Sequence, residues 1–439
     1  MKSLRPSRRQ AMQQPAEKSD LNFMRLALRL ARRGYGATSP NPMVGAVLVK
    51  GGKIIGRGWH RQAGLPHAEI EALRDAQKHG RSPRGAALYV TLEPCCTQGR
   101  TPPCTDAIIA AGIKRVVVGA KDPNPRHAGR GFRILRQAGI DVFAMSDGVG
   151  KALRAGRDAG GTLAAAPRAQ RARSDTPCRH LAEECARLNE AFNHWIVRRT
   201  PFVTVKAAMT LDGKIAAASG ESKWITGEKA RAFGMNLRRA SDAILVGVNT
   251  ILADDPSLTL RAKRSDREWK IGKPIRRIVL DSMARTPLKS KVISDEQAAL
   301  TTIVTSGNAP QNRVAALGKH VKVVVAPLAQ RAIGHRQPAI NLGWLLKKLG
   351  LENVTSLLVE GGGEVNASFL LAGFAQRVAF FYAPKVLGGS GARKGVAGNG
   401  ARNFGEVVQL REVQWREVGD DLLLLALTAP GGVVRARRL

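Results

Sequence analysis

The sequence contains no long hydrophobic run and few cysteines. The longest wholly apolar run near the C-terminus, residues 422–427, has six residues, whereas a membrane-spanning helix needs about 18 or more. The residues behind the basic N-terminus are polar, so we expect no signal peptide and a cytoplasmic protein. Five cysteines in 439 residues do not make a disulfide framework. Three of them fall within ten residues, which favours a metal or catalytic site.

Acidic side chains are also scarce. Lys plus Arg number 70 against 34 for Asp plus Glu, which gives a net charge of +36. Such a charge indicates nucleic acid or anionic small molecules as partners. The basic residues are spread along the whole chain, which is more typical of a protein that binds phosphorylated small ligands. We therefore do not expect nucleic acid or a membrane as the partner.

The length predicts two or three domains, and 44% hydrophobic residues are enough for packed cores. An amphipathic pattern predicts a helix over 22–33, with Asp20 as its N-cap. Further along, the pattern β-β-α-β-α-β predicts one sheet with helices packed on it. Its strands are expected at 43–49, 53–59, 87–92 and 115–120, and its helices at 67–78 and 105–111.

A second series of strand-like runs begins at Pro201 and predicts a second α/β domain. The strands are expected at 202–209, 243–248, 276–281, 301–306, 321–326, 356–361, 378–383 and 421–427, with helices at 227–240, 341–350 and 363–372. We expect a helix at 181–195 before this series. The predicted organisation is a basic tail (1–20), a first domain (21–148), an Ala/Arg-rich linker with a connecting helix (149–199) and a second domain (200–432).

The strongest chemical signal combines one imidazole with two thiols. His67 precedes a predicted helix, Cys95 follows a strand and Cys104 opens the next helix. One His and two Cys ligands leave the fourth tetrahedral position of zinc open for water, as in catalytic zinc sites. Zinc lowers the pKa of such a water from about 15.7 to about 7. The order H-x-E then P-C is the signature of zinc nucleobase deaminases, although the step from Cys95 to Cys104 is longer than in the short form.

Glu69 is suited to move the proton of that water. It lies two residues after His67, and the two side chains share a site only at a helix start, where Pro66 places them. We prefer Cys95 over Cys96 as the ligand because Cys95 directly follows Glu93-Pro94. The alternative is a buried histidine among core cysteines. Cys178 and Cys185, outside the cluster, are expected to be ordinary free thiols.

These motifs resemble those of the bifunctional riboflavin-biosynthesis deaminase/reductase family. The resemblance spans roughly 22–148 and 200–428, and it includes TLEPC (91–95), GRTPPC (99–104), KAAMTLDGKIA (206–216) and VEGGGEVNASFL (359–370). It implies a cytidine-deaminase-like α/β/α domain followed by a dihydrofolate-reductase-like α/β domain. The first would hydrolyse the 2-amino group of a diaminopyrimidine carrying a ribosylamino 5′-phosphate, and the second would reduce the ribose to a ribityl chain with NADPH.

By the same resemblance, His67, Cys95 and Cys104 bind zinc and Glu69 is the catalytic residue. Asn41 is a further candidate for gripping the pyrimidine, although Asn-Pro is equally turn chemistry. The sequence departs from the family at Thr97 and Gln98, where the family commonly carries histidine or another aromatic residue. The linker is also longer than usual, by roughly 15–20 residues.

The second domain lacks the G-x-G-x-x-G fingerprint of a Rossmann fold. Instead Glu360-Gly361-Gly362-Gly363 ends a strand and opens a helix, where backbone N–H groups can approach a phosphate, although a plain tight turn fits equally. Lys206 is a candidate acid or electrostatic contributor at the sugar, or a surface lysine. The resemblance implies cofactor binding by Ala208, Trp224, Thr250, Asp254, Ser282, Gly362, Gly363 and Glu364, and substrate binding by Ser222, Arg238, Leu258, Arg261 and Glu360.

Two other functions compete with this bifunctional enzyme. One is a zinc deaminase that edits nucleic acid and carries a non-catalytic second domain, which the net charge of +36 would suit. The other is a binding protein with degenerate sites, against which the complete set of zinc ligands argues. A homo-oligomer is expected only because oligomers are common among enzymes.

Overall fold

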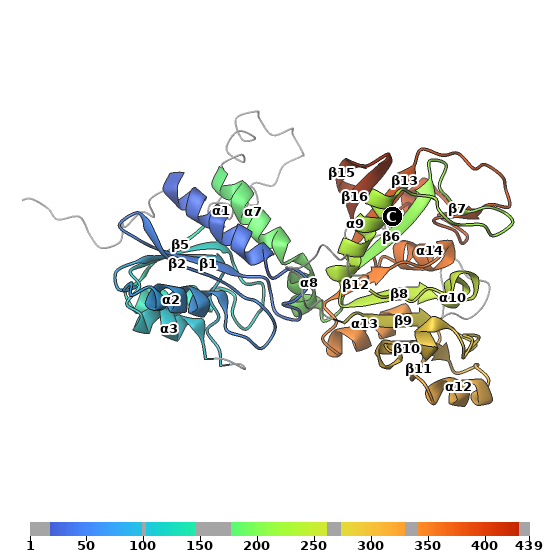
Figure 1. Ribbon diagram of the computed structural model, residues 1–439, viewed down its shortest axis with the longest axis horizontal. Helices are drawn as coiled ribbons and strands as arrows, with labels where there is room; N and C mark the ends of the chain where they lie inside the picture. The colour runs from blue at the N-terminus through green and yellow to red at the C-terminus, as the bar shows by residue number, and fades with distance from the viewer. Residues whose placement is uncertain (1–17, 99–101, 146–176, 261–273, 330–339, 430–439) are drawn as a thin grey trace, which may run out of the picture. The chain divides into compact units, whose positions relative to one another are not determined.

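The computed structural model describes residues 18–98, 102–145, 177–260, 274–329 and 340–429. These residues form two units that divide between Val197 and Arg198. In Figure 1 the first unit runs from blue to green and the second from green to red. Within the described ranges, no helix is both long enough and apolar enough to cross a bilayer.

The first unit is built on a five-stranded sheet in the order β2-β1-β3-β4-β5. Strand β1 pairs antiparallel with β2 and β3, while β3, β4 and β5 are parallel. The two central parallel strands are buried along nearly their whole length, which explains why they read as continuous apolar runs. The sequence missed the edge strand β5. The strand bounds are β1 Gly45–Lys50, β2 Lys53–Trp59, β3 Ala87–Leu92, β4 Arg115–Ala120 and β5 Asp141–Ala144.

Helices cover both faces of this sheet, so the predicted α/β/α layering is confirmed. Figure 1 shows α1 and α7 on one face and α2 and α3 on the other. The core between these layers consists almost entirely of Ala, Val, Leu and Ile. The helix bounds are α1 Lys18–Arg32, α2 Ala68–Lys78, α3 Cys104–Ala110, α4 Arg130–Gln137, α7 Pro177–Leu188 and α8 Glu190–Arg198.

Two local predictions in this unit are wrong. Asp20 is not an N-cap but lies inside α1, where its buried carboxylate accepts hydrogen bonds from the Tyr89 hydroxyl (2.6 Å) and from Arg115 (3.1 and 3.2 Å). The single helix expected at 181–195 is two helices that meet at Asn189. The Asn189 side chain accepts from the Met43 amide (2.7 Å) and donates to the Met43 carbonyl (2.9 Å), which fixes the junction beside β1.

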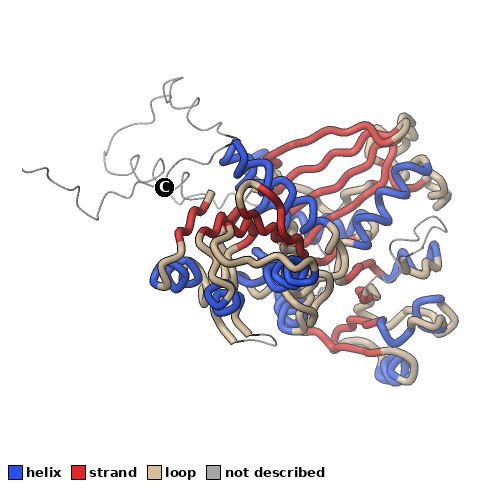
Figure 2. The backbone as a smooth tube through the Cα atoms, turned by 60° about the vertical axis from the view of Figure 1, so that its left-hand side comes forward, coloured by secondary structure: helices blue, strands red, loops and turns tan. Residues whose placement is uncertain are grey.

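The second unit contains a nine-stranded sheet in the order β11-β10-β9-β8-β12-β6-β13-β16-β15. Strands from β11 to β13 are parallel, and β16 and β15 add antiparallel at one edge. Figure 2 shows the strands of both sheets in red with helices in blue on their faces. The bounds in this sheet are β6 Phe202–Thr210, β8 Ala243–Gly247, β9 Arg276–Leu280, β10 Thr301–Ser306, β11 Lys322–Ala326, β12 Ser356–Val359, β13 Arg377–Ala383, β15 Leu410–Val418 and β16 Asp421–Thr428.

All eight strands predicted for this unit are present, but the edge strand β15 was not predicted. Eight of its nine residues are exposed, and its apolar residues do not alternate regularly with polar ones, so the sequence pattern predicted no strand there. The short strands β7 (Lys214–Ala216) and β14 (Arg393–Lys394) pair separately. The helices are α9 Glu228–Arg239, α10 Val248–Asp254, α11 Lys291–Ser294, α12 Gln311–Gly318, α13 Leu342–Leu351 and α14 Gly363–Leu371, with 3₁₀ turns at Ala298–Leu300 and Phe404–Glu406.

Parallel strands place their carboxyl ends at one edge of a sheet, and ligands of such sheets bind there. In the second unit β8 ends at Gly247 and β12 ends at Val359. Helix α10 begins directly after β8, and α14 begins at Gly363, after a three-residue turn that follows β12. This edge is where the residues predicted to bind cofactor and substrate gather.

Candidate functional sites

The three predicted zinc ligands lie together in the first unit. His67 is the N-cap of α2, Cys104 is the first residue of α3, and Cys95 lies in the loop after β3. The His67 Nδ1 atom is 3.2 Å from Cys104 Sγ and 3.5 Å from Cys95 Sγ. All three candidate ligand atoms lie within 4.8 Å of one another. One ring nitrogen and two sulfurs at this spacing fit the donor set of a catalytic zinc site.

Electrostatics in this cluster favour a thiolate at Cys95. Hydrogen bonds from Cys104 and His67 lower the pKa of Cys95 to about 4. The backbone N–H of Cys104 also points at the Cys95 sulfur, at 3.3 Å. The pKa of Cys104 is raised because it shares its hydrogen with Cys95 and is fully buried. The hydrogen bond with Cys95 raises the pKa of His67.

Glu69 is buried beside the cluster, with 3% of its surface exposed. Its burial raises the pKa of its carboxyl to about 6, which is close to neutral pH and suits a group that accepts and returns protons. The helix start predicted at Pro66 is confirmed: His67 is the N-cap of α2 and Glu69 is its second residue. Cys96 is buried outside the cluster.

A cavity of about 280 Å³ opens onto these residues. The candidate Asn41 lines it and makes a hydrogen bond with the ring of His60 (3.1 Å). Burial lowers the pKa of His60, which favours its neutral form. The sequence missed several other residues of this wall, because they come from the connecting helix α8 and from the loop after β4. They are Phe192, Trp195, Ile196, Asp122, Asn124 and His127.

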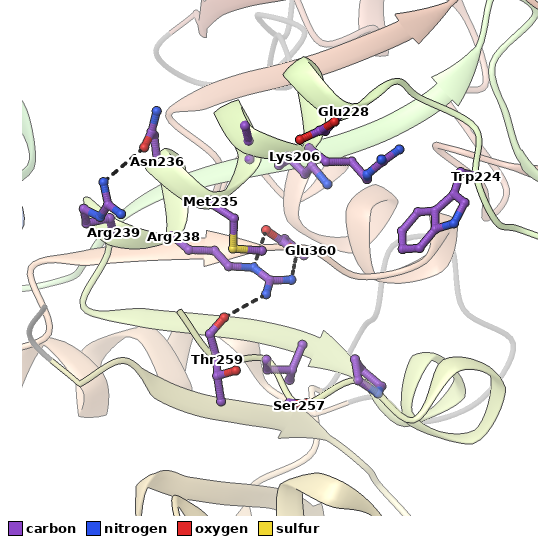
Figure 3. Close-up of a pocket in the computed structure, with 15 residues that line it drawn as sticks. Lys206, Trp224, Glu228, Met235, Asn236, Arg238, Arg239, Ser257, Thr259 and Glu360 are labelled. Atoms are coloured by element: carbon purple, nitrogen blue, oxygen red, sulfur yellow. Dashed lines mark hydrogen bonds and ion pairs between the residues drawn. The ribbon is translucent and has the colours of Figure 1, made fainter. Parts of the chain in front are cut away.

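Two adjoining cavities, of about 620 and 330 Å³, lie in the second unit and share several lining residues. Arg238 and Glu360 stand at their junction and form a bidentate ion pair of 3.1 and 2.7 Å (Figure 3). Arg238 also donates to the carbonyl of Thr259 at 3.2 Å. Lys206 lines both cavities, which argues against a mere surface lysine. Burial alone would raise the pKa of Glu360. The positive charges of Lys206 and Arg238 outweigh burial, so the pKa of Glu360 is lowered.

Most of the positions carried over by resemblance line these cavities. Ser222 lies 3.3 Å from Asp254, whose carboxylate also pairs with Lys223 at 3.5 Å. Leu258 is buried with a left-handed backbone, φ 53°. The lining positions are Ala208, Ser222, Trp224, Arg238, Thr250, Asp254, Leu258, Glu360 and Gly362.

Three predicted cofactor positions do not line either cavity. Ser282 follows β9, and its carbonyl accepts from Ser306. Glu364 accepts from the amide of Gly398. At Gly363 an added Cβ would lie 2.2 Å from the carbonyl oxygen of Lys394, so close packing of the chain itself requires this glycine. Arg261 lies outside the described residues.

Comparisons with known proteins agree with this arrangement of sites. A family model described as the cytidine and deoxycytidylate deaminase zinc-binding region matches residues 17–120. A second, described as the RibD C-terminal domain, matches residues 201–424. The riboflavin biosynthesis protein RibD of Actinobacillus pleuropneumoniae is 40% identical over 92% of this chain and 94% of its own length. That of Aquifex aeolicus is also 40% identical, over 92% and 97%.

Solved structures give the same result. RibD of Acinetobacter baumannii aligns with a TM-score of 0.74 at 33% identity, covering 94% of this chain and 99% of that one. A Thermotoga maritima protein described as a diaminohydroxyphosphoribosylaminopyrimidine deaminase/5-amino-6-(5-phosphoribosylamino)uracil reductase aligns at 0.71 and 32% identity, over 94% and 99%.

The fold and the two sites therefore define a zinc-dependent deaminase joined to a pyrimidine reductase. The chain belongs to the RibD family of bifunctional deaminases and reductases of riboflavin biosynthesis. It is thus both a hydrolase and an oxidoreductase, with zinc and NADPH as its cofactors. The predicted fold class, of a cytidine-deaminase-like and a dihydrofolate-reductase-like domain, is confirmed.

Proposed function

We propose that the first unit removes the 2-amino group of 2,5-diamino-6-(5-phosphoribosylamino)pyrimidin-4-one and that the second unit reduces the ribosyl group of the product to ribityl. The proposal rests on the position of Glu69, which is buried at one cavity beside His67, Cys95 and Cys104. The Thermotoga maritima protein that this chain resembles is described as a diaminohydroxyphosphoribosylaminopyrimidine deaminase, which names this class of substrate. It carries a phosphate, which agrees with the excess of basic residues in this chain.

In the deaminase, we assign zinc to His67, Cys95 and Cys104. When bound there, zinc supplies a Lewis acid that makes water acidic enough to attack at neutral pH. Glu69 takes a proton from the attacking water and delivers one to the departing amine. Its burial supports this role, because a carboxyl with a pKa of about 6 is present in both protonation states near neutrality.

In the reductase, we assign substrate contacts to Ser222, Arg238, Leu258, Arg261 and Glu360. The bidentate pair with Glu360 holds the Arg238 side chain in one conformation. Its remaining N–H groups can therefore bind the substrate without further loss of side-chain freedom. NADPH supplies a hydride when bound. We assign its contacts to Ala208, Trp224, Thr250, Asp254, Ser282, Gly362, Gly363 and Glu364. The open space at Gly362 leaves room for a phosphate at the start of α14.

The decisive experiment replaces Glu69 by glutamine. Because Glu69→Gln keeps the shape of the side chain but cannot accept the proton, ammonia release should fall about 100- to 10,000-fold. Reduction of the already deaminated product, followed at 340 nm, should be unchanged, and zinc should stay at about one per chain. Loss of both activities in a folded variant would contradict two separate sites, and full ammonia release would exclude Glu69.

Nucleic-acid editing is not favoured as an alternative. It leaves the second unit without a role, whereas the reductase family model spans residues 201–424. Steeply salt-dependent binding to single-stranded RNA, with no ammonia release from the pyrimidine phosphate, would be needed to reverse this conclusion.

We also propose that the protein acts in the cytoplasm, where a reducing compartment keeps cysteines out of disulfides, as all five are in this chain. A homo-oligomer is proposed on the general frequency of oligomers among enzymes. For the functional domains we retain the limits 21–148 and 200–432, with the tail 1–20 and the connecting segment 149–199. Helix α8 of this connecting segment contributes Phe192, Trp195 and Ile196 to the lining of the deaminase cavity.

A further inference from the structure

An amide side chain joins the connecting helices to the wall of the deaminase cavity. Asn189 lies between α7 and α8, and only 4% of its surface is exposed. Its Oδ1 atom accepts a hydrogen bond from the backbone amide of Met43 at 2.7 Å, and its Nδ2 atom donates to the Met43 carbonyl at 2.9 Å. One side chain therefore satisfies both backbone groups of a residue that lies 146 positions away in the sequence.

Met43 belongs to a short segment of the cavity wall. Residues 40–42 and Val44 line the cavity on either side of it. Asn41 lies between two prolines, whose rings restrict the backbone on both sides of it. The hydrogen bonds from Asn189 hold the end of this segment, so they also limit where the Asn41 side chain can lie.

The same amide orients helix α8. Phe192 and Ile196 lie three and seven positions after Asn189, so the three side chains share one face of the helix. Phe192, Trp195 and Ile196 line the cavity, and the ring centroids of Phe192 and Trp195 are 6.3 Å apart. The contact of Asn189 with the cavity wall therefore brings an apolar helix face to the deaminase site.

A side chain needs one donor and one acceptor to make both contacts with Met43, and an amide has both. An aspartate at position 189 could still accept from the Met43 amide, but it would turn a second acceptor toward the Met43 carbonyl. Because the position is buried, water cannot compensate for two acceptors that face each other. The contact is thus specific for an amide and not only for the size of the side chain.

We propose that Asn189 is a positioning residue for the deamination: its amide docks α8 on the segment 40–44, so that Asn41 and the apolar face of α8 are in place when the pyrimidine binds. This inference rests on the proposed function and deepens it, because it makes the connecting helix a part of the deaminase site. Substrate that binds only the docked form has a KM that rises as the docked fraction falls, whereas kcat is unchanged.

The test measures KM and kcat for ammonia release from the diaminopyrimidine phosphate. Asn189→Asp keeps the shape of the side chain and loses the donor, whereas Asn189→Ser is too short for either contact. Each variant should raise KM about tenfold, the effect of losing one buried hydrogen bond. The value of kcat should stay within about twofold, because α2 and α3 carry Glu69, His67 and Cys104. Asn189→Ser decides the question if Asn189→Asp fails to fold.

Asn193 supplies a matched control in the same helix. Its side chain donates to the carbonyl of Ala186 at 3.0 Å, within the connecting segment. Asn193→Asp and Asn193→Ser remove this hydrogen bond and leave the contact with Met43 intact, so both constants should stay within about twofold. Hydrogen–deuterium exchange reports the docking itself, and the amides of 190–197 should exchange faster in the two Asn189 variants than in the Asn193 variants. Zinc content and reductase activity are measured in every variant.

Several results would overturn the inference. An unchanged KM in the Asn189 variants would do so, and so would an equal rise of KM in the Asn193 variants. A raised KM without faster exchange in α8 would show that the helix stays docked. A loss of zinc in step with ammonia release would show that Asn189 supports the metal site instead. Failure of the unaltered protein to release ammonia from this substrate would refute the proposed function.

Discussion

At the scale of the residue, Arg277 is the largest side chain with no exposed surface in the described chain. Its guanidinium binds Asp295 through two hydrogen bonds of 2.6 and 2.7 Å. It also donates to the Thr301 hydroxyl and to the carbonyls of Val292 and Ser257. Ser257 lines the larger reductase cavity, so this buried arginine supports the loop beside the predicted substrate residue.

Replacing Arg277 by methionine should destabilise the protein strongly. The variant leaves Asp295 without its cation and removes the donor to the Thr301 hydroxyl and to the Ser257 carbonyl, so we expect the free energy of unfolding to fall by about 3–5 kcal/mol. Urea unfolding of the full chain measures this. The control is Arg276→Met, the partly exposed neighbour whose ion pair with Glu352 is worth about 1 kcal/mol or less. Equal effects of the two substitutions would contradict the prediction.

The ion pair between Arg277 and Asp295 also predicts how the stability of the protein depends on pH. The hydrogen bonds from Arg277 lower the pKa of Asp295 below its ordinary value of about 4. A carboxyl whose pKa is lowered on folding stabilises the fold above its ordinary pKa, and this contribution is lost as pH falls through the folded value. The difference in stability between the unaltered protein and Arg277→Met should therefore shrink below about pH 4. If the difference in stability between the two proteins instead grew at acid pH, the predicted direction of this pH dependence would be wrong.

At the scale of the element, glycines set how closely α2 approaches the sheet. A Cβ added at Gly58 of β2 would lie 2.3 Å from the carbonyl oxygen of Ala68 and 2.4 Å from the amide of Ala72. Both contacts are with helix backbone, which cannot rotate away. Because Ala68 lies between His67 and Glu69 in the sequence, this contact fixes the position of the proposed metal ligand and of the proposed catalytic carboxylate.

Gly58→Ala should therefore damage the deaminase selectively. The methyl group would push the start of α2 off the sheet at a cost of about 1–3 kcal/mol, which should lower zinc occupancy and ammonia release while reduction continues. Zinc analysis and the two activity assays measure this. Gly318→Ala, at a helix position with nothing within 4 Å, is the control and should be neutral. Full zinc occupancy in Gly58→Ala would show that the helix start does not depend on this contact.

At the scale of the whole molecule, two units carry two separate chemistries. The deaminase residues all lie before Val197 and the reductase residues all lie after Arg198. Each cavity is lined from its own unit, and each unit has its own core. The two activities should therefore respond independently to the removal of zinc.

Treatment with a chelator tests this independence. Dipicolinate should abolish ammonia release, because the two thiols and the imidazole would be left without the ion that they hold. Oxidation of NADPH with the deaminated product should keep its rate, and added zinc should restore ammonia release. Parallel loss of the reductase, with its unit still folded by circular dichroism, would show that the second site also depends on the metal.

The predictions from sequence succeeded where a residue's role is local. The predicted zinc ligands and Glu69 lie together, as expected from their spacing around strand ends and helix starts, and the buried strands were found because both of their faces are apolar. The edge strand β15 was missed because eight of its nine residues are exposed. Asp20 was misassigned because its partners, Tyr89 and Arg115, are distant in sequence.

The amino-acid sequence by itself determined the order of elements, the family and the donor set for zinc, since each depends on neighbouring residues or on motifs. Only the tertiary structure decided which side chains complete the sites. Phe192 and Trp195 reach the deaminase cavity from the connecting helix, His127 meets Thr97 from another loop, and Arg238 pairs with Glu360 across 122 positions of sequence. Such contacts form when strands far apart in the chain become neighbours in a sheet, and no local pattern encodes them.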